Sequence, residues 1–286
     1  MAREVKITPT PFLTQGEVYL LATAELVKVH PSVRMEAWPT WNQMTGGFRA
    51  REFSILCGST GSGKTTFLAN MSAQLLKQGV KHFVMSVETG HADFMKRVMS
   101  VLAGRDLNTG ESINPDHLAR LHTEHIDALE SECIQFSIYE NRVSVEQLMA
   151  DLRYMVEIRG CKIAFIDNLN FFMEVTSAAN QIIEMDRVIH ELIIFCKQVD
   201  VHLVMVMHPK KTEYTRVESE FDVKGSSTAV QEAHNVFLFN RPKPDTDGPL
   251  SNRELKVAKM RRRGAFVGRT IKFECRGVTY SDKGAM

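Results

Sequence analysis

The chain has 286 residues, of which 44% are hydrophobic and 24% are charged, as is ordinary for a soluble globular protein. The formal net charge is only +1, so the overall charge gives no indication of nucleic-acid binding, and no apolar stretch approaches the ~20 residues that cross a bilayer. The N-terminal residues resemble neither a secretory signal nor an organellar transit peptide. We therefore expect one large α/β domain with a short arm, and no membrane partner.

The cysteines indicate a reducing compartment. There are five of them, widely scattered and without metal or redox spacing, and most lie in or beside apolar runs. They are Cys57, Cys133, Cys161, Cys196 and Cys275. We expect buried, reduced thiols and an intracellular protein.

The first 45 residues differ in character from the remainder, because four prolines interrupt them: Pro9, Pro11, Pro31 and Pro39. Between these prolines, residues 17–29 form an apolar-rich helical segment that is too isolated to bury itself. We expect this helix to pack on the core or on a neighbouring subunit. The predicted division is an N-terminal arm with a linker helix over 1–45 and a catalytic domain over 46–286.

A complete phosphate-binding P-loop follows, Gly-Ser-Thr-Gly-Ser-Gly-Lys-Thr at 58–65, directly after the apolar run 53–57. In this motif the backbone N–H groups cradle phosphates, the lysine reaches the β- and γ-phosphates, and the last hydroxyl binds Mg²⁺. A chance glycine-rich turn is the alternative, but a strand before the motif and a helix after it favour nucleotide binding. The predicted nucleotide-binding residues are Gly58, Ser59, Thr60, Gly61, Ser62, Gly63, Lys64, Thr65 and Thr66.

Strand and helix patterns then alternate along the chain. Helical periodicity predicts helices over 66–78, 91–103, 115–132, 144–159 and 178–199, and a short helix after 225. Apolar runs predict strands over 82–87, 134–139, 161–166, 201–207, 236–239, 254–260, 267–274 and 277–280. The alternation predicts an α/β fold, with a mainly parallel central sheet, helices on both of its faces, and an antiparallel extension formed by the strands after 236.

Four polar side chains follow the carboxyl ends of predicted parallel strands, where ligands bind in such sheets. They are Lys64, Glu88, Asp167 and His208. Asp167 ends an apolar strand in the manner of a Walker B segment and would hold Mg²⁺, although an ordinary strand-end acid is the alternative. Glu88 ends a strand that we expect beside the P-loop strand, where a carboxylate can deprotonate the water that attacks the γ-phosphate. The alternative for Glu88 is a solvated acid at a turn.

Three histidines and a cysteine between residues 117 and 133 raise the possibility of zinc. They are His117, His122, His125 and Cys133. Their spacing places no i, i+4 pair on one helical face, so it does not favour a metal site.

At this point a family resemblance becomes specific. The matching segments, in order, are 58–67, Ser86-Val87-Glu88 followed by Arg97, 165–169, 206–211, Gly225-Ser226 with 231–236, and 259–261 followed by Gly264. Over about residues 35–280 the chain resembles the helicase domain of the RecA-like hexameric replicative helicases. It is most similar to the Twinkle-type and phage primase-helicases, and bacterial DnaB is a more distant relative. Only the P-loop is specific by itself, and the order of the segments makes the combination strong.

The resemblance implies a role for each matching residue. Glu88 would act as the base, Asp167 with Thr65 would hold Mg²⁺, and His208 would sense the γ-phosphate. A histidine that faces the core is the alternative for His208. The cofactors implied are ATP or another nucleoside triphosphate, and Mg²⁺.

The resemblance also implies contacts beyond the chain's own nucleotide. Lys259 and Arg261 would reach the nucleotide of the adjacent subunit, Arg261 as an arginine finger. A solvated basic face is the alternative, and Arg262 and Arg263 have no clear counterpart in the family, so the identity of the finger stays open. The residues implied to contact single-stranded DNA are Lys210, Lys224, Gly225 and Ser226.

The function implied is that of a Mg²⁺- and ATP-dependent ring helicase, a hexamer that moves 5′→3′ on single-stranded DNA in the cytoplasm of a bacterial or phage-infected cell. Relatives carry a primase, primase-like or helical domain that the chain does not show, so we expect a separate primase, loader or polymerase as partner. A RecA-like recombinase or filament ATPase without unwinding activity is one alternative, which oligomer geometry would distinguish. An ATPase regulator that does not bind DNA is another, and stimulation of hydrolysis by DNA would exclude it.

Overall fold

The structure is a computed structural model that describes residues 13–27, 32–108, 113–137, 144–168, 178–210, 216–224, 227–242 and 251–285. The chain divides into two units, residues 1–31 and residues 32–286. The first unit holds helix α1 (Gln15–Val27), which begins two residues before the predicted start. Thr14 explains this start, because its hydroxyl accepts a hydrogen bond from the Glu17 N–H while the Glu17 carboxylate accepts one from the Thr14 N–H.

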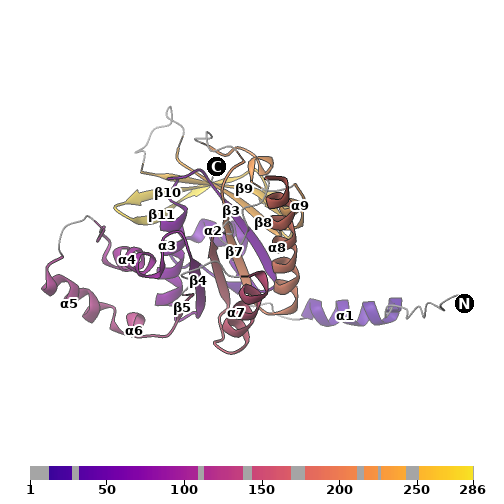
Figure 1. The fold of residues 1–286 in the computed structure, drawn as a ribbon, viewed down its shortest axis with the longest axis horizontal. Coiled ribbons are helices and arrows are strands. Elements are labelled where there is room, and N and C mark those ends of the chain that lie inside the picture. The colour runs from indigo at the N-terminus through magenta and orange to yellow at the C-terminus, as the bar shows by residue number, and fades with distance from the viewer. Residues whose placement is uncertain are drawn as a thin grey trace, which may run out of the picture. The chain divides into compact units, whose positions relative to one another are not determined.

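The second unit is built on a nine-stranded sheet (Figure 1) in the order β11-β10-β9-β8-β3-β7-β6-β4-β5. Its strands are β3 (Glu52–Cys57), β4 (His82–Ser86), β5 (Ile134–Phe136), β6 (Ile163–Asp167), β7 (His202–Met207), β8 (Asn235–Asn240), β9 (Arg253–Met260), β10 (Thr270–Arg276) and β11 (Thr279–Ala285). The strands from β8 to β5 in this order are parallel, and β9, β10 and β11 are antiparallel. The predicted mainly parallel sheet with an antiparallel extension is confirmed.

Two details of this sheet differ from expectation. The strand at 236–239 was placed in the antiparallel extension, but β8 pairs parallel with β3, and the antiparallel part begins at β9. The strand that ends at Glu88 was expected beside the P-loop strand, and this was wrong, because β7 and β6 lie between β3 and β4. Parallel strands share one carboxyl edge, so Glu88 still lies on the edge that carries the P-loop.

Helices cover both faces of the sheet, as predicted. On one face α3 (Lys64–Lys77) and α4 (His91–Ala103) contribute to a core cluster that includes Phe67 and Phe94. On the other face α7 (Val145–Glu157) and α8 (Ala178–Gln198) contribute to a second cluster that includes Leu148 and Leu192. Side chains alternate along each strand, so β3 directs Ile55 to the second cluster and Leu56 to the first.

The segment 32–45 was assigned to the arm, yet it contributes buried side chains to the larger unit. It contains β1 (Ser32–Val33), which pairs with β2 (Phe48–Arg49), and a short helix, α2 (Pro39–Thr45). Pro39 occupies the first turn of this helix, where proline is tolerated, so it begins the element that it was expected to break. Trp38 stacks on Phe67 with ring centroids 4.8 Å apart.

The remaining helices are short. The predicted helix over 115–132 is divided into α5 (Pro115–Glu124) and α6 (Ile126–Leu129), and α9 (Ser227–Glu232) precedes β8. His125 lies at the break and donates a hydrogen bond to the Leu102 carbonyl. Across the described ranges, no three histidine, cysteine or acidic side chains are grouped to hold a metal ion. No helix in the same ranges is long and apolar enough to span a membrane.

Candidate nucleotide-binding site

The loop between β3 and α3 has the backbone shape that phosphate binding requires. Gly61 and Gly63 have φ angles of +74° and +94°, a region that side chains with a Cβ rarely adopt. A Cβ on Gly58 would lie 2.4 Å from the Phe239 carbonyl oxygen of β8. The glycines of the motif are therefore required by local conformation and by close packing.

A pocket of about 440 Å³ opens over this loop and is lined by all four polar residues predicted at the strand ends, Lys64, Glu88, Asp167 and His208. Among the loop residues predicted to bind nucleotide, Thr60, Gly61, Gly63, Thr65 and Thr66 also line it. The ammonium of Lys64 donates hydrogen bonds to the carbonyls of Gly58 (2.8 Å) and Ser59 (3.0 Å). Burial lowers the pKa of Lys64, and the charge of Asp167 opposes that shift.

Thr65 and Asp167, which both line the pocket, form a pair of oxygen ligands. The Thr65 hydroxyl donates to Asp167 Oδ2 at 2.8 Å, and Asp167 is 3% exposed. Burial raises the pKa of Asp167, and the hydrogen bond from Thr65 partly offsets the shift. A hydroxyl and a carboxylate are hard ligands of the kind that Mg²⁺ prefers, so the pair fits that ion.

Glu88, Asn168 and His208 form a hydrogen-bonded group at the ends of β4, β6 and β7. The Asn168 amide donates to Glu88 Oε2 (2.9 Å) and lies 3.2 Å from His208 Nε2, while Glu88 and His208 are 3.8 Å apart. Burial, followed by the charge of Lys64, lowers the pKa of His208, so the ring is neutral near neutral pH. The sequence predicted the acid and the histidine at this edge but assigned no role to the amide between them.

Further residues to which the sequence assigned no role reach the pocket, although Arg97 belongs to a segment that carries the family resemblance. Arg97 of α4 lines the pocket, and its buried Nε has no hydrogen-bond partner among the described residues. Arg253 of β9 donates to the Ser62 carbonyl, and the Tyr280 hydroxyl of β11 would lie 2.8 Å from a Cβ on Gly63. Ser62 Oγ is buried without a partner in the same ranges. Arg97, which lines the pocket beside the glycine cradle, fits a bound phosphate, whereas Ser62 is not among the described residues that line the pocket.

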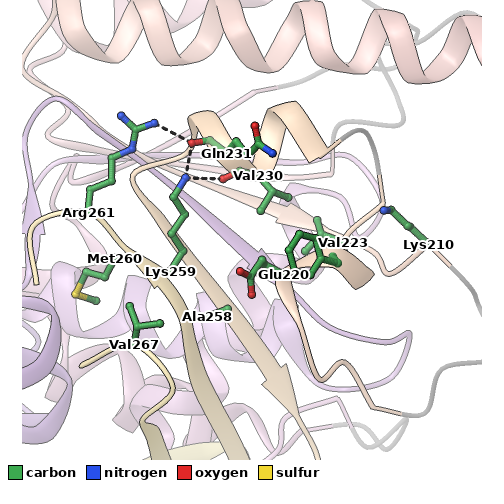
Figure 2. A pocket seen from close by; sticks show the side chains of 11 residues that line it. Lys210, Glu220, Val223, Val230, Gln231, Ala258, Lys259, Met260, Arg261 and Val267 are labelled. Carbon is green, nitrogen blue, oxygen red and sulfur yellow. Dashed lines mark hydrogen bonds between the residues drawn. The ribbon is translucent and has the colours of Figure 1, made fainter. Parts of the chain in front are cut away.

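Lys259 and Arg261 lie elsewhere, beside a second pocket of about 420 Å³ (Figure 2). The Lys259 ammonium donates to the carbonyls of Val230 (2.8 Å) and Gln231, and Arg261 Nη2 donates to the Gln231 carbonyl (2.8 Å). Both cations thus sit at the C-terminal end of α9, which the helix dipole favours. Neither is among the described residues that line the nucleotide pocket.

The neighbouring arginines have other partners within the chain. Arg262 pairs with the buried carboxylate of Glu52 at 3.1 Å, and Arg263 donates to the Gln43 carbonyl at 2.6 Å. Arg261, the first of the three consecutive arginines, is exposed and is held through the Gln231 carbonyl.

Two of the predicted DNA contacts are described and two are not. Lys210 and Lys224 are both exposed. Their backbone N–H groups donate to the carbonyls of Asp222 (2.7 Å) and His208 (2.9 Å), which ties the segment carrying Lys224 to the strand end at His208. Gly225 and Ser226 lie outside the described residues.

Comparison with known proteins gives a matching family and a similar protein. The family model of the DnaB-like helicase C-terminal domain matches residues 37–282. A DNA helicase/primase of Enterobacteria phage T3 is 24% identical over 213 residues, which are 70% of this chain but 37% of the relative, so the chain spans well under half of that protein.

Two solved structures share the fold. The structure of a DnaB-like replicative helicase, studied with its interactions with primase, aligns with a TM-score of 0.75 over 96% of this chain and 67% of that one. A second structure, of an isolated ATPase domain, aligns with a TM-score of 0.76 over 94% of this chain and 98% of that one. Both structures are 15% identical to the chain, so they establish its fold.

Proposed function

The chain belongs to the family of DnaB-like helicase C-terminal domains, and we propose that it is the ATP-hydrolysing motor of a replicative DNA helicase. One observation carries the proposal. A single pocket brings together the P-loop lysine, an oxygen pair suited to Mg²⁺, and an acid hydrogen-bonded through an amide to a histidine. These are the parts that phosphoryl transfer to water requires.

In this proposal the loop 58–66 holds the phosphates of ATP. Lys64 turns from the carbonyls of Gly58 and Ser59 to the β- and γ-phosphates, which are more negative acceptors. Thr65 and Asp167 would hold Mg²⁺, which neutralises charge on the phosphates when it is bound. Arg97 supplies a further donor to the same pocket.

Glu88 is the proposed base. Asn168 fixes the orientation of its carboxylate, and Lys64 and Arg97 lie across the same pocket. The carboxylate takes a proton from the attacking water as the bond from that water to the γ-phosphorus forms and the bond to ADP breaks. His208 is proposed to sense the γ-phosphate: it lines the pocket, and its backbone carbonyl accepts a hydrogen bond from the N–H of Lys224.

Lys259 and Arg261 are proposed to act on the nucleotide of an adjacent copy. Two observations support this: they lie outside their own chain's nucleotide pocket, and the described partners of both are neutral carbonyls, whereas Arg262 is paired with the Glu52 carboxylate. Such an arrangement requires an oligomer, and we propose a homohexameric ring. Helix α1 carries exposed Val18, Tyr19 and Leu20, and we propose that it is a linker helix that docks on the next subunit.

Lys210 and Lys224, with Gly225 and Ser226, are proposed to hold the backbone of single-stranded DNA, along which the ring moves 5′→3′. Exposed ammonium groups and small residues suit phosphate contacts that do not depend on sequence. By its likeness to a DnaB-like helicase studied with primase, we propose a primase as partner, a separate loader or polymerase, and action in the cytoplasm of a bacterial or phage-infected cell.

The proposal is tested by measuring ATP hydrolysis with and without Mg²⁺ and single-stranded DNA, together with strand displacement on a forked duplex and imaging of the assembly. We expect Mg²⁺-dependent hydrolysis that DNA accelerates, displacement of the duplex strand, and closed rings. Stimulation by DNA with helical filaments and no strand displacement would point instead to a RecA-like filament ATPase. Hydrolysis that is indifferent to DNA would point to a regulator.

A further inference from the structure

The segment 216–224 leads into the proposed DNA contacts, and its C-terminal end is attached to the nucleotide pocket. The N–H of Lys224 bonds the carbonyl of His208, and the Pro209–Val223 bridge lies alongside. This attachment connects the C-terminal end of the segment to His208, the proposed phosphate sensor. The N-terminal end of the segment is attached separately.

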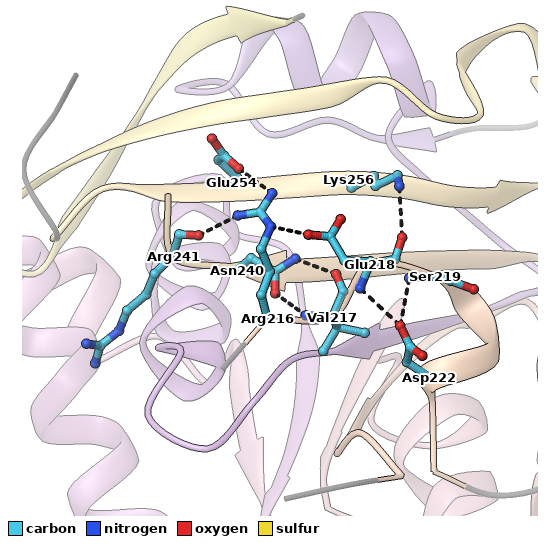
Figure 3. Close-up of polar contacts among 9 residues, drawn as sticks. All are labelled: Arg216, Val217, Glu218, Ser219, Asp222, Asn240, Arg241, Glu254 and Lys256. Carbon is cyan, nitrogen blue, oxygen red and sulfur yellow. Dashed lines mark hydrogen bonds and ion pairs between the residues drawn. The ribbon is translucent and has the colours of Figure 1, made fainter. Parts of the chain in front are cut away.

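The N-terminal end is held by Arg216, whose guanidinium has three partners among the described residues (Figure 3). Its Nη1 donates to the Arg241 carbonyl (2.7 Å), its Nη2 pairs with Glu254 (2.7 Å), and its Nε pairs with Glu218 (2.8 Å). Arg241 in turn donates from its own side chain to the Gly61 carbonyl in the phosphate-binding loop (3.0 Å). Arg241 therefore links Arg216 directly to the P-loop.

Burial makes this connection stiff. The Glu254 side chain is only 9% exposed, and a buried carboxylate is costly without a charged partner, so the ion pair with Arg216 matters here. The Glu218 side chain is 55% exposed, so its ion pair with Arg216 matters less. The Asn240 side chain accepts a hydrogen bond from the Val217 N–H and donates one to the Val217 carbonyl, both at 2.8 Å. The chain at 216–217 thus cannot shift without disturbing β8 or β9.

We propose that Arg216 is a positioning residue that couples the phosphate-binding loop to the DNA-binding segment. It acts through Arg241 and Glu254 and contacts neither nucleotide nor DNA. Phosphates that enter the loop displace the Gly61 carbonyl to which the Arg241 guanidinium donates, and a shift of Arg241 moves the backbone carbonyl that accepts a hydrogen bond from Arg216. The inference depends on the proposed function, because it assumes that the segment leads to DNA.

The test is the coupling between two ligands at equilibrium. The affinity for a labelled oligo-dT strand is measured with and without a non-hydrolysable ATP analogue, and the affinity for the analogue is measured with and without oligo-dT. Linkage requires the two ratios to agree, and allosteric couplings are typically about 5- to 150-fold. Arg216→Lys keeps a cation beside Glu254 but loses the planar fork that spans three partners. In this variant we expect the coupling factor to fall at least about fivefold while each ligand alone binds as in the wild type.

Two further variants make the result specific. Glu218→Gln removes only the exposed partner of Arg216 and should retain the wild-type coupling factor. The double variant Arg216→Gln with Glu254→Gln replaces the buried ion pair by a neutral pair and should lose coupling as Arg216→Lys does. Unchanged coupling in Arg216→Lys and in the double variant would overturn the inference. Equal losses in both single-ligand affinities at an unchanged ratio would do the same, because they would show a merely structural role. A wild-type protein that fails to bind oligo-dT would instead overturn the proposed function, and this inference with it.

Discussion

At the scale of single residues, cationic side chains donate hydrogen bonds to carbonyls of the phosphate-binding loop. Within the described ranges they are Lys64, bonded to Gly58 and Ser59, Arg241, bonded to Gly61, and Arg253, bonded to Ser62. A carbonyl is a weaker acceptor for a cation than a phosphate oxygen is, so bound nucleotide would compete for Lys64 and Arg253, which line the pocket. Their present partners keep the cations directed at the loop.

Lys64→Ala should abolish ATP hydrolysis and leave the fold intact, because the β- and γ-phosphates lose the lysine that the P-loop provides for them. The fold should survive because burial already disfavours the charged form of this lysine. Hydrolysis rates and thermal unfolding check the two parts, with Lys77→Ala, an exposed lysine on the same helix, as the control. Near-normal turnover in Lys64→Ala would contradict the assignment of this pocket as the site of ATP hydrolysis.

Glu88→Gln should retain nucleotide binding and slow hydrolysis by about 10²-fold or more, as expected for the loss of a general base. A glutamine oxygen can still accept the hydrogen bond from Asn168, so the substitution removes the basic function with little change in geometry. Single-turnover hydrolysis and analogue binding measure the two effects separately. Weaker binding with unchanged turnover per bound nucleotide would mean that Glu88 is structural.

At the scale of elements, the features that could be predicted from the sequence are those determined by residues close to one another in the chain. The P-loop was predictable because a buried strand, three glycines and a helix follow one another directly, and its predicted helix, 66–78, overlaps α3 closely. The positions of Glu88, Asp167 and His208 on one edge followed from the single rule that parallel strands share a carboxyl edge. In the structure all three residues line one pocket, and their roles in hydrolysis are proposals.

What could not be predicted depends on distant pairing. The order of strands places β7 and β6 between β3 and β4, and nothing near Glu88 in the sequence encodes that insertion. Arg253 and Tyr280 reach the P-loop only because β9, β10 and β11 extend the sheet on the side of β8. In the sequence, the segment that forms α2 resembles an irregular arm because of its prolines. It is held on the larger unit by distant contacts of Trp38, which stacks on Phe67 and donates a hydrogen bond from its indole to the Tyr280 carbonyl at 2.8 Å.

Lys224→Ala should weaken binding of single-stranded DNA about equally for all sequences, because an exposed ammonium contacts phosphate rather than bases. The salt dependence should flatten by about 0.7 in log–log slope, the value for one lost contact on a single strand. The backbone hydrogen bond from Lys224 to His208 does not involve the side chain, so the segment should keep its position. Salt titrations of oligo-dT binding measure the slope.

Lys162→Ala is the matched control for this substitution. Lys162 is exposed and immediately precedes β6, at the amino edge of the sheet and therefore at the opposite edge from the nucleotide pocket. Its loss should leave affinity and slope unchanged. An unchanged slope in Lys224→Ala as well would move the DNA path away from this segment.

At the scale of the whole molecule, the buried histidines His82 and His202 make the stability of the fold depend on pH. His82 donates to the Val80 carbonyl and lies 2.6 Å from the Ser72 hydroxyl, and His202 donates to the Arg49 carbonyl and lies 2.8 Å from the Ser54 hydroxyl. Burial lowers the pKa of each to about 4, from an ordinary value of 6.5. Each ring is therefore neutral in the folded protein over a range in which the unfolded chain is protonated.

The free energy of unfolding should therefore be constant above pH 6.5, as far as these groups contribute, and fall as the pH drops toward 4. Between those values the unfolded state binds more protons, so each histidine should contribute a slope of about 1.4 kcal/mol per pH unit. Denaturant unfolding at a series of pH values measures this slope, and His82→Gln should reduce it by close to one proton. A slope that is the same in His82→Gln and the wild type would show that His82 does not titrate as described.

The assembly is tested most sharply at Arg261, because a finger that acts in trans can be complemented by another subunit. Arg261→Ala should bind nucleotide and still assemble, since the side chain it removes is exposed and bonds the Gln231 carbonyl of its own chain, yet it should hydrolyse ATP poorly. An arginine finger can contribute about 10³–10⁵ in rate, so the loss should be large. Hydrolysis by Arg261→Ala alone, by Lys64→Ala alone and by mixtures of the two is the measurement.

In a mixture, some interfaces pair an intact P-loop from the Arg261→Ala subunit with an intact Arg261 from the Lys64→Ala subunit, and these interfaces regain every part. A cis-acting arginine cannot be complemented in this way, because each subunit would carry its own defect. We therefore expect activity in the mixture above the sum of the two variants, and a modest gain, because random assembly yields few complete interfaces.

Arg276→Ala, an exposed arginine that pairs with Glu274 on β10, is the control and should hydrolyse ATP as the wild type does. Full activity of Arg261→Ala alone would remove it from the mechanism. No rescue, with subunit exchange verified independently, would instead indicate that Arg261 acts within its own chain, with Arg262 or Arg263 as the finger, or a ring that tolerates no inactive subunit.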